Sequence, residues 1–139
     1  MKGLPVLGAD TVVSIDGLVL GKPGSDAEAA VMLRRLSGKT HEVLTGVALL
    51  TPDDKAERGL AVEVATTRVE FRELSEEQIA EYVRSGEPRD KAGAYGIQGL
   101  ASKFVMRIEG CYFNVVGLPI ALVCQMLEQE YRGGRGTHV

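Results

Sequence analysis

The sequence predicts one α/β domain in which helices flank a mixed β-sheet. Its 139 residues, 45% of them hydrophobic, suffice for a single hydrophobic core. Apolar segments with strand-like patterns alternate with segments whose apolar residues follow helical spacing. A short polar stretch between two strand-like segments predicts at least one antiparallel pair. We expect the domain to span residues 1–131 and residues 132–139 to form a flexible tail.

Composition argues against several classes of function. A net charge of −3 provides no basic surface for nucleic acid or for an anionic membrane. No apolar stretch approaches the roughly 20 residues that span a bilayer. The start MKGLPVLGAD does not resemble a signal peptide, and Cys111 and Cys124 lack the spacing of a disulfide scaffold or a zinc site. We therefore expect a reduced, cytoplasmic domain without nucleic-acid or membrane partners.

The first predicted strand, residues 6–13 (VLGADTVV), contains a carboxylate, and an Asp16-Gly17 turn after it predicts a short hairpin. A buried carboxylate is costly unless it is neutralised, paired or bound to a metal. We therefore expect Asp10 at a strand end, facing a site. From the tetrapeptide GADT alone, an acid that hydrogen-bonds its neighbours would be the simpler interpretation.

Three helices are predicted by their end signals. Capping boxes begin one helix at Ser25 and another at Ser75, and glycines end them at Gly38 and Gly86. The last helix begins near Pro119, since proline is favoured in the first turn. The residues expected on its buried face are Ile120, Val123, Cys124 and Leu127.

The remaining strands follow from apolar patterning. Residues 40–51 are apolar on both parities, which is typical of a central strand covered on both faces. After a polar hairpin loop at residues 52–59, residues 61–73 predict a second strand. Its apolar parity shifts, and a bulge near residues 66–68 would reconcile the two halves. Residues 103–108 predict a further strand.

Two further segments suggest chemistry. Gly21-Lys22-Pro23 lies close enough to Asp10 in sequence for the ammonium to return to the same end of the sheet. An acid that activates water or holds a cation, with an ammonium that neutralises phosphate, suits phosphoanhydride cleavage. A solvated surface lysine is the alternative. His41 is expected at an exposed or hydrogen-bonded strand end.

The segment from Asp90 to Gly99 (DKAGAYGIQG) predicts an ordered loop whose glycines let the backbone approach another group closely. The amide of Gln98 complements the N3–H and carbonyl edge of uracil or thymine. The same amide, rotated, suits cytosine. A glutamine that bonds its own loop backbone is an equal alternative.

Seven motifs occur in one order along most of the chain: GADTVV, LGKP, LSGKTHEVLTGVAL, VEFREL, YVRSGEPRDKAGAYGIQG, RIEG and NVVGLP. On these motifs the chain, from Val6 to about Leu127, resembles the Maf (septum-formation) family of nucleoside triphosphate pyrophosphatases. The resemblance implies a fold related to the house-cleaning inosine triphosphatases. It also implies cleavage of a nucleoside triphosphate to the monophosphate and pyrophosphate with a divalent cation, usually magnesium.

The same resemblance implies roles for individual residues. Asp10 matches the family's general base, and Lys22 matches its phosphate-contacting lysine. Thr11 and Gln98 occupy positions tied to base selection, and Lys91 lies in the loop near the site. The motif AYGIQG resembles the corresponding loop of the branch that acts on dTTP and UTP, and it differs from the loop of the branch associated with 7-methyl-GTP. No metal ligand is identified.

The start of the chain differs from the family pattern, in which a strand, a Ser-x-Ser-Pro-Arg phosphate loop and a helix come first. The sequence thus resembles a member without this N-terminal part, and an exposed sheet edge would favour self-association, such as a homodimer. We expect slower pyrophosphate release than from a version with the loop, whose donors would neutralise charge. The alternative function is a catalytically impaired nucleotide-binding domain or a regulator linked to division.

Overall fold

The computed structural model describes residues 4–52 and 58–135 and confirms the α/β class. Its strands are β1 (Val6–Ile15), β2 (Leu18–Leu20), β3 (Thr40–Pro52), β4 (Arg58–Phe71) and β5 (Val105–Glu109). Its α-helices are α1 (Asp26–Leu36), α2 (Glu76–Arg84), α3 (Tyr112–Val116) and α4 (Ile120–Arg135). Three 3₁₀ turns are η1 (Glu87–Asp90), η2 (Ala92–Ala94) and η3 (Leu100–Phe104).

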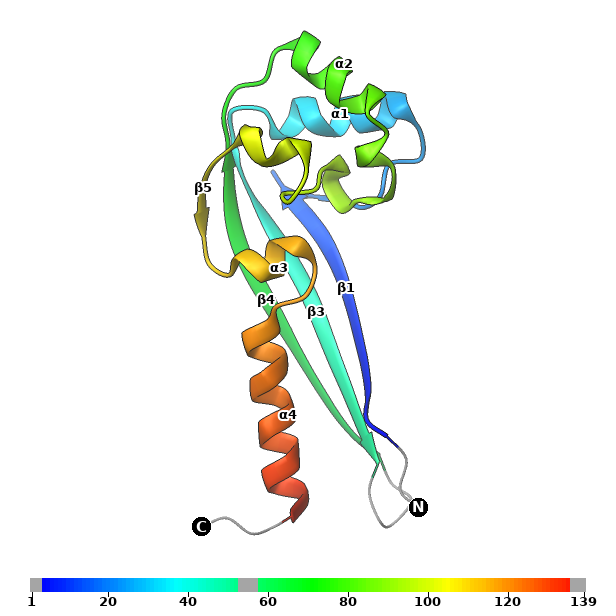
Figure 1. The fold of residues 1–139 in the computed structure, drawn as a ribbon, viewed down its shortest axis with the longest axis vertical. Helices are drawn as coiled ribbons and strands as arrows, with labels where there is room; N and C mark the ends of the chain where they lie inside the picture. Colours follow the sequence, from blue (N-terminus) through cyan, green and yellow to red (C-terminus); the bar gives the residue numbers. More distant parts are fainter. Residues whose placement is uncertain (1–3, 53–57, 136–139) are drawn as a thin grey trace.

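The strands form one sheet in the order β2-β1-β3-β4-β5, and every pairing described is antiparallel, not mixed as expected. β3 and β4 form a long hairpin, and β1 lies beside β3. Helix α4 runs alongside the lower part of this hairpin (Figure 1). The predicted loop between β3 and β4 falls mostly on residues 53–57, which lie outside the described residues.

Local signals for turns and caps are confirmed, except that the capping box predicted at Ser25 is incomplete, because the Glu28 carboxylate accepts from the Gly24 N–H and not from that of Ser25. Asp16 and Gly17 have φ angles of 51° and 78°, as a two-residue hairpin turn with positive φ at both positions requires. The Ser25 hydroxyl accepts a hydrogen bond from the N–H three residues later at 3.1 Å. Ser75 and Gln78 form the complete capping box, with bonds of 3.1 and 2.9 Å. These contacts satisfy N–H groups that would otherwise lack partners at the helix starts.

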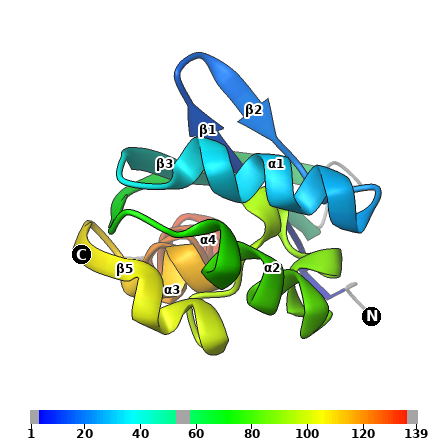
Figure 2. The ribbon, with the colours of Figure 1, turned by 90° about the horizontal axis from the view of Figure 1, so that it is seen from above.

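The core lies on one face of the sheet. The odd-numbered residues of β3 are buried: His41, Val43, Thr45, Val47 and Leu49. At the upper end, α1 and α2 lie side by side and pack on this face (Figures 1 and 2). At the lower end, Val47 and Leu49 pack against Val123 and Met126 of α4. Side-chain alternation therefore places both apolar clusters on the same side of β3.

The predicted bulge in the middle of β4 is wrong. The register between β3 and β4 is continuous, and the irregularity lies between Glu70 and Phe71, opposite β5. The parity changes because Val62 and Val64 lie on the uncovered face, where both are 59% exposed, while Val69 is fully buried. The even-numbered apolar residues of β3 are only half-buried, so that strand is not covered on both faces as predicted.

The buried face predicted for the last helix is also wrong in part. Val123 is buried as expected, but its buried neighbour is Met126. Ile120, Cys124 and Leu127 are exposed. The buried residues of this helix in the described part belong to the small lower cluster, so the choice of face depends on Val47 and Leu49 rather than on the helix's own apolar pattern.

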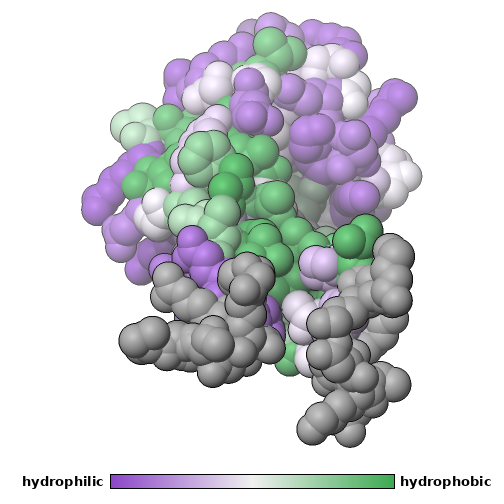
Figure 3. All heavy atoms as spheres, turned by 60° about the horizontal axis from the view of Figure 1, so that its bottom comes forward, coloured by the Kyte–Doolittle hydropathy of each residue, from purple (hydrophilic) through white to green (hydrophobic). Residues whose placement is uncertain are grey.

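Helix α4 continues to Arg135, four residues into the predicted tail. Adding residues to an existing helix costs little, since nucleation is the expensive step. Residues 136–139 lie outside the described part. Within it, no helix is both long and apolar enough to cross a membrane. With the lower end forward, hydrophobic residues gather in the middle of the visible face, and hydrophilic residues cover its upper part (Figure 3).

We expect Val69→Ala to lower the free energy of unfolding by about 2–3 kcal/mol, because it removes buried methyl groups and leaves a cavity. Val62→Ala is the matched control on the same strand and should change it by less than about 0.5 kcal/mol. Urea unfolding followed by circular dichroism measures both. Equal losses would contradict the assignment of the two residues to opposite faces.

Candidate active site

A hollow of about 450 Å³ lies between β1, β3, the segment from Glu87 to Gly99, and the end of α3. This volume is typical of a small-molecule site. The structure brings to its lining all five residues singled out in the sequence: Asp10, Thr11, Lys22, Lys91 and Gln98. They come from three separate stretches of the chain, so the fold and not sequence proximity assembles them.

The two lysines converge because two loops are joined by their backbones. The Gly93 N–H donates a hydrogen bond to the Gly21 carbonyl at 3.0 Å, which holds the Lys22 segment against the Lys91 segment. The Lys91 ammonium lies 3.0 Å from the Asp90 carboxylate. The hydrogen bond and charge of Lys91, and then the charge of Lys22, lower the pKa of Asp90. One exposed carboxylate thus has two ammonium groups near it.

Close approach of the loop backbone, which the glycines predicted, is confirmed. A Cβ at Gly93, where φ is 69°, would lie 2.7 Å from the Val13 side chain. A Cβ at Gly96 would lie 2.7 Å from Cε of Lys91. Contacts this short do not occur in real proteins, so glycine is needed at Gly93, where φ is also positive, whereas a side chain at Gly96 would require the flexible end of Lys91 to move. The loop can therefore pack directly on β1, with the Lys91 stem against it.

Gln98 is exposed at the hollow while its loop is anchored beneath it. Tyr95 and Ile97 are buried. The Tyr95 hydroxyl forms a 2.7 Å hydrogen bond with Nε2 of His41, so His41 is a buried, hydrogen-bonded residue and not an exposed strand end. Among the described residues, the exposed Gln98 amide has no hydrogen-bond partner, so the expected alternative, a bond to its own loop backbone, is not seen there. The reading of a base by Gln98 stays a prediction.

Thr11 contributes to the wall of the hollow. Its hydroxyl lies 2.8 Å from the Thr45 hydroxyl and donates a longer bond of 3.5 Å to the Gly117 carbonyl. Asn114, fully buried, donates to the Val43 carbonyl at 3.1 Å and ties α3 to the sheet. Thr11 therefore has a structural part in holding α3 in place. Its link to base selection stays a prediction.

Asp10 borders the hollow from β1, where it is exposed and pairs with Gly46 of β3. Side chains alternate along a strand, so Asp10 and Thr11 belong to opposite faces. Over Val6–Val12, the other edge of β1 pairs with no strand in the described part of the chain. Asp10 thus lies in the middle of β1 and not at a strand end as expected, and it borders the hollow at an edge that is unpaired among the described residues. Its role in a site stays a prediction.

The carboxylates around the hollow fit a cation brought by a substrate better than a metal cage built by the protein. Among the described residues, no group of three or more His, Cys, Asp or Glu could hold a metal ion. Glu87 accepts from the Leu100 N–H, and Asp90 pairs with Lys91. Mg²⁺ is usually bound by one or two carboxylates together with substrate phosphates and waters. Asp10 borders the hollow as a further carboxylate.

Sequence reasoning missed three residues that shape the hollow. Glu87 and Tyr95 line it directly, and Tyr82 supports the loop from α2. Gly86, with φ of 80°, followed by a proline two residues later, signals a turn before Glu87. Nothing in that local pattern shows where the carboxylate points.

These features define a class, an α/β domain with a nucleotide-sized site lined by lysines, an acid and an amide. Residues 2–130 match the family model described as Maf-like protein, and the chain belongs to this family. It is 56% identical over 124 residues to the dTTP/UTP pyrophosphatase of Koribacter versatilis, covering 89% of this chain and 62% of that protein.

Two further relatives carry the same name. The dTTP/UTP pyrophosphatase of Syntrophomonas wolfei is 55% identical over 134 residues, 96% of this chain and 67% of that protein. The one from a Geobacillus strain is 58% identical over 116 residues, 84% of this chain and 60% of that protein. The chain thus spans 60–67% of the length of these three relatives.

We expect His41 to make stability depend on pH. Burial lowers its pKa from 6.5 to about 4, so the neutral imidazole stabilises the fold fully above pH 6.5. This stabilisation, about 3 kcal/mol, should be lost as the pH falls from 6.5 toward 4, because the unfolded chain takes up the proton first. Urea unfolding of the wild type and of His41→Gln at each pH tests this. Parallel pH profiles would contradict it.

Proposed function

We propose that the protein hydrolyses dTTP and UTP to the nucleoside monophosphate and pyrophosphate. The observation that carries this proposal is the single hollow that joins Asp10, Lys22, Lys91 and Gln98. A nucleoside triphosphate needs cationic groups for its phosphates and a fixed polar group for its base. The name dTTP/UTP pyrophosphatase, shared by relatives more than half identical to this chain, supports the choice of substrates.

In the proposed reaction, water attacks the α-phosphorus. A bond forms between the water oxygen and that phosphorus, and the bond from the α-phosphorus to the bridging oxygen of the β-phosphate breaks. Asp10 accepts the proton of the attacking water, and Lys22 and Lys91 neutralise charge that builds on the departing pyrophosphate. Asp90 lies near both ammonium groups. When the triphosphate binds, its phosphates replace the Asp90 carboxylate as the partner of these two ammonium groups.

A divalent cation, for which we propose Mg²⁺, would neutralise phosphate charge when bound. Asp10 borders the hollow in which this cation would be held together with the substrate. We propose the cytoplasm as the compartment, where nucleoside triphosphates are present. A homodimer through the open edge of β1 is the oligomer we propose, because an unpaired strand edge favours pairing with another chain.

Asp10→Asn should lower the rate of pyrophosphate release from dTTP and UTP by at least about 10²-fold, the lower end for loss of a general base. Asp16→Asn is the matched control and should leave the rate unchanged. It makes the same chemical change in the β1–β2 turn, where asparagine also tolerates positive φ. The assay measures pyrophosphate with Mg²⁺ present.

Two results would contradict this assignment. Equal rates for Asp10→Asn and the wild type would remove Asp10 from the reaction. Binding of dTTP by calorimetry without pyrophosphate release from the wild type would instead support the alternative, a nucleotide-binding or regulatory domain.

Gln98→Ala should weaken the use of dTTP and UTP relative to other triphosphates by about 1–3 kcal/mol, the cost of an unmade hydrogen bond in a buried site. The ratio of kcat/KM values for dTTP and dATP measures this. Gln125→Ala, an exposed position on α4, is the control. Unchanged selectivity would show that the loop does not read bases.

A further inference from the structure

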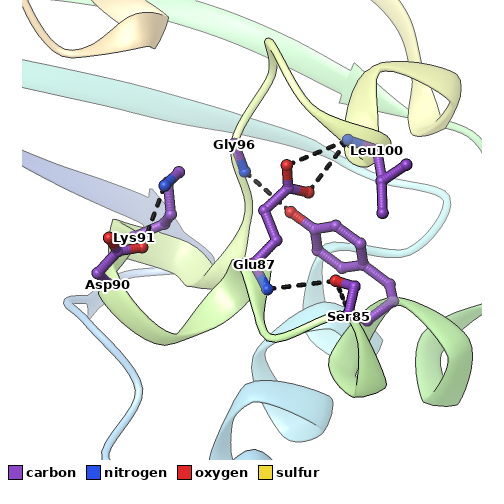
Figure 4. Close-up of polar contacts among 7 residues, drawn as sticks. Ser85, Glu87, Asp90, Lys91, Gly96 and Leu100 are labelled. Atoms are coloured by element: carbon purple, nitrogen blue, oxygen red, sulfur yellow. Dashed lines mark hydrogen bonds and ion pairs between the residues drawn. The ribbon is translucent and has the colours of Figure 1, made fainter.

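Glu87 directs its carboxylate at the backbone of the glycine-rich loop. Both of its oxygens accept from the Leu100 N–H, at 3.2 and 3.1 Å (Figure 4). Any side chain at Gly99 would overlap this carboxylate. Glu87 is half-buried and borders the hollow. Glycine at position 99 therefore leaves space for the Glu87 carboxylate, which holds the Leu100 N–H.

Tyr82, on α2, holds the same loop at a second point, four residues before Leu100. Its buried hydroxyl accepts from the Gly96 N–H at 3.0 Å. Burial raises the pKa of Tyr82, and the charge of the neighbouring Glu87 carboxylate raises this pKa further. The hydroxyl therefore stays protonated. Two side chains thus hold two backbone amides of the same loop.

We propose that Glu87 and Tyr82 are positioning residues that set the direction in which the Gln98 amide enters the hollow. The two amides they hold, Gly96 and Leu100, each lie two residues from Gln98. The base-reading side chain is exposed between two fixed points of the backbone. This inference rests on the proposed function, because it concerns how that function selects its base.

The energetic reason is that a hydrogen-bonding side chain discriminates between bases only when its donor and acceptor are held in place. If the backbone on either side moves, the amide can follow a mismatched base, and the penalty for that base falls. Releasing one anchor should therefore change selectivity more than it changes the rate with the preferred base.

A catalytic or metal-binding role for Glu87 would lead to a different result when its charge is removed. Such a role requires the negative charge, whereas holding the Leu100 N–H requires only an oxygen acceptor. Glutamine retains the acceptor and removes the charge, so Glu87→Gln separates the two roles. Tyr82→Phe removes the hydroxyl from the other side of the loop with little change in volume.

The test compares Glu87→Ala, Glu87→Gln and Tyr82→Phe with Glu81→Ala, an exposed acid on α2, as control. Amide hydrogen exchange, followed by NMR without nucleotide, should be about ten-fold faster at Leu100 in Glu87→Ala and at Gly96 in Tyr82→Phe, the scale of one lost hydrogen bond. The preference for dTTP over dCTP in kcat/KM should fall about ten-fold in both. In Glu87→Gln, both the exchange at Leu100 and the preference for dTTP should stay close to the wild-type values, unlike in Glu87→Ala.

Unchanged exchange at Leu100 in Glu87→Ala, or equal losses in Glu87→Gln and Glu87→Ala, would overturn the proposal. So would a loosened loop with unchanged base preference. If the wild type releases no pyrophosphate, the proposed function fails separately. The side-chain amide signals of Gln98 then decide: a shift in Glu87→Ala and Tyr82→Phe but not in Glu81→Ala supports the proposal, and no shift overturns it. If Glu87→Ala does not fold, Tyr82→Phe carries the test.

Discussion

Much of the candidate site depends on the alternation of side chains along β3. Its buried residues occur at every second position and carry both apolar clusters and one wall of the hollow. His41 holds Tyr95 of the glycine-rich loop, and Thr45 contacts Thr11 of β1. A slip of β3 by one residue in register would turn His41, Thr45 and the other buried residues of this strand to the uncovered face. The long pairing of β3 with β4 and with β1 is therefore what the site requires first.

Features of the fold that depend on nearby residues could be predicted from the sequence, and those that depend on packing could not. The Asp16-Gly17 turn and the caps at Ser25 and Ser75 involve partners within three residues, so the local pattern contains the whole signal. The face of α4 depends on what the sheet presents to it. Likewise, Val62 looks the same in sequence whether its face of the sheet is covered or open.

The same division applies to the site. Asp10, Lys22 and Gln98 have local signals: an acid in an apolar strand, a lysine between glycine and proline, and an amide among glycines. Glu87 and His41 do not, because their importance comes from partners 13 and 54 positions away in the sequence. The resemblance to Maf proteins adds roles for residues but does not supply these supporting contacts. Only the three-dimensional structure shows them.

The topology also matters while the chain is being made. Val6 pairs with Leu50 and Ser14 with Glu42, so β1 leaves the ribosome roughly 28–44 residues before its partner strand. At about 5–20 residues per second, β1 waits on the order of seconds, whereas a β-hairpin closes within microseconds. During this interval the edge of β1 that will pair with β3 is unpaired and is available to chaperones or to other nascent chains. Synthesis rate, as well as the final contacts, thus bears on how much of the protein reaches the folded state.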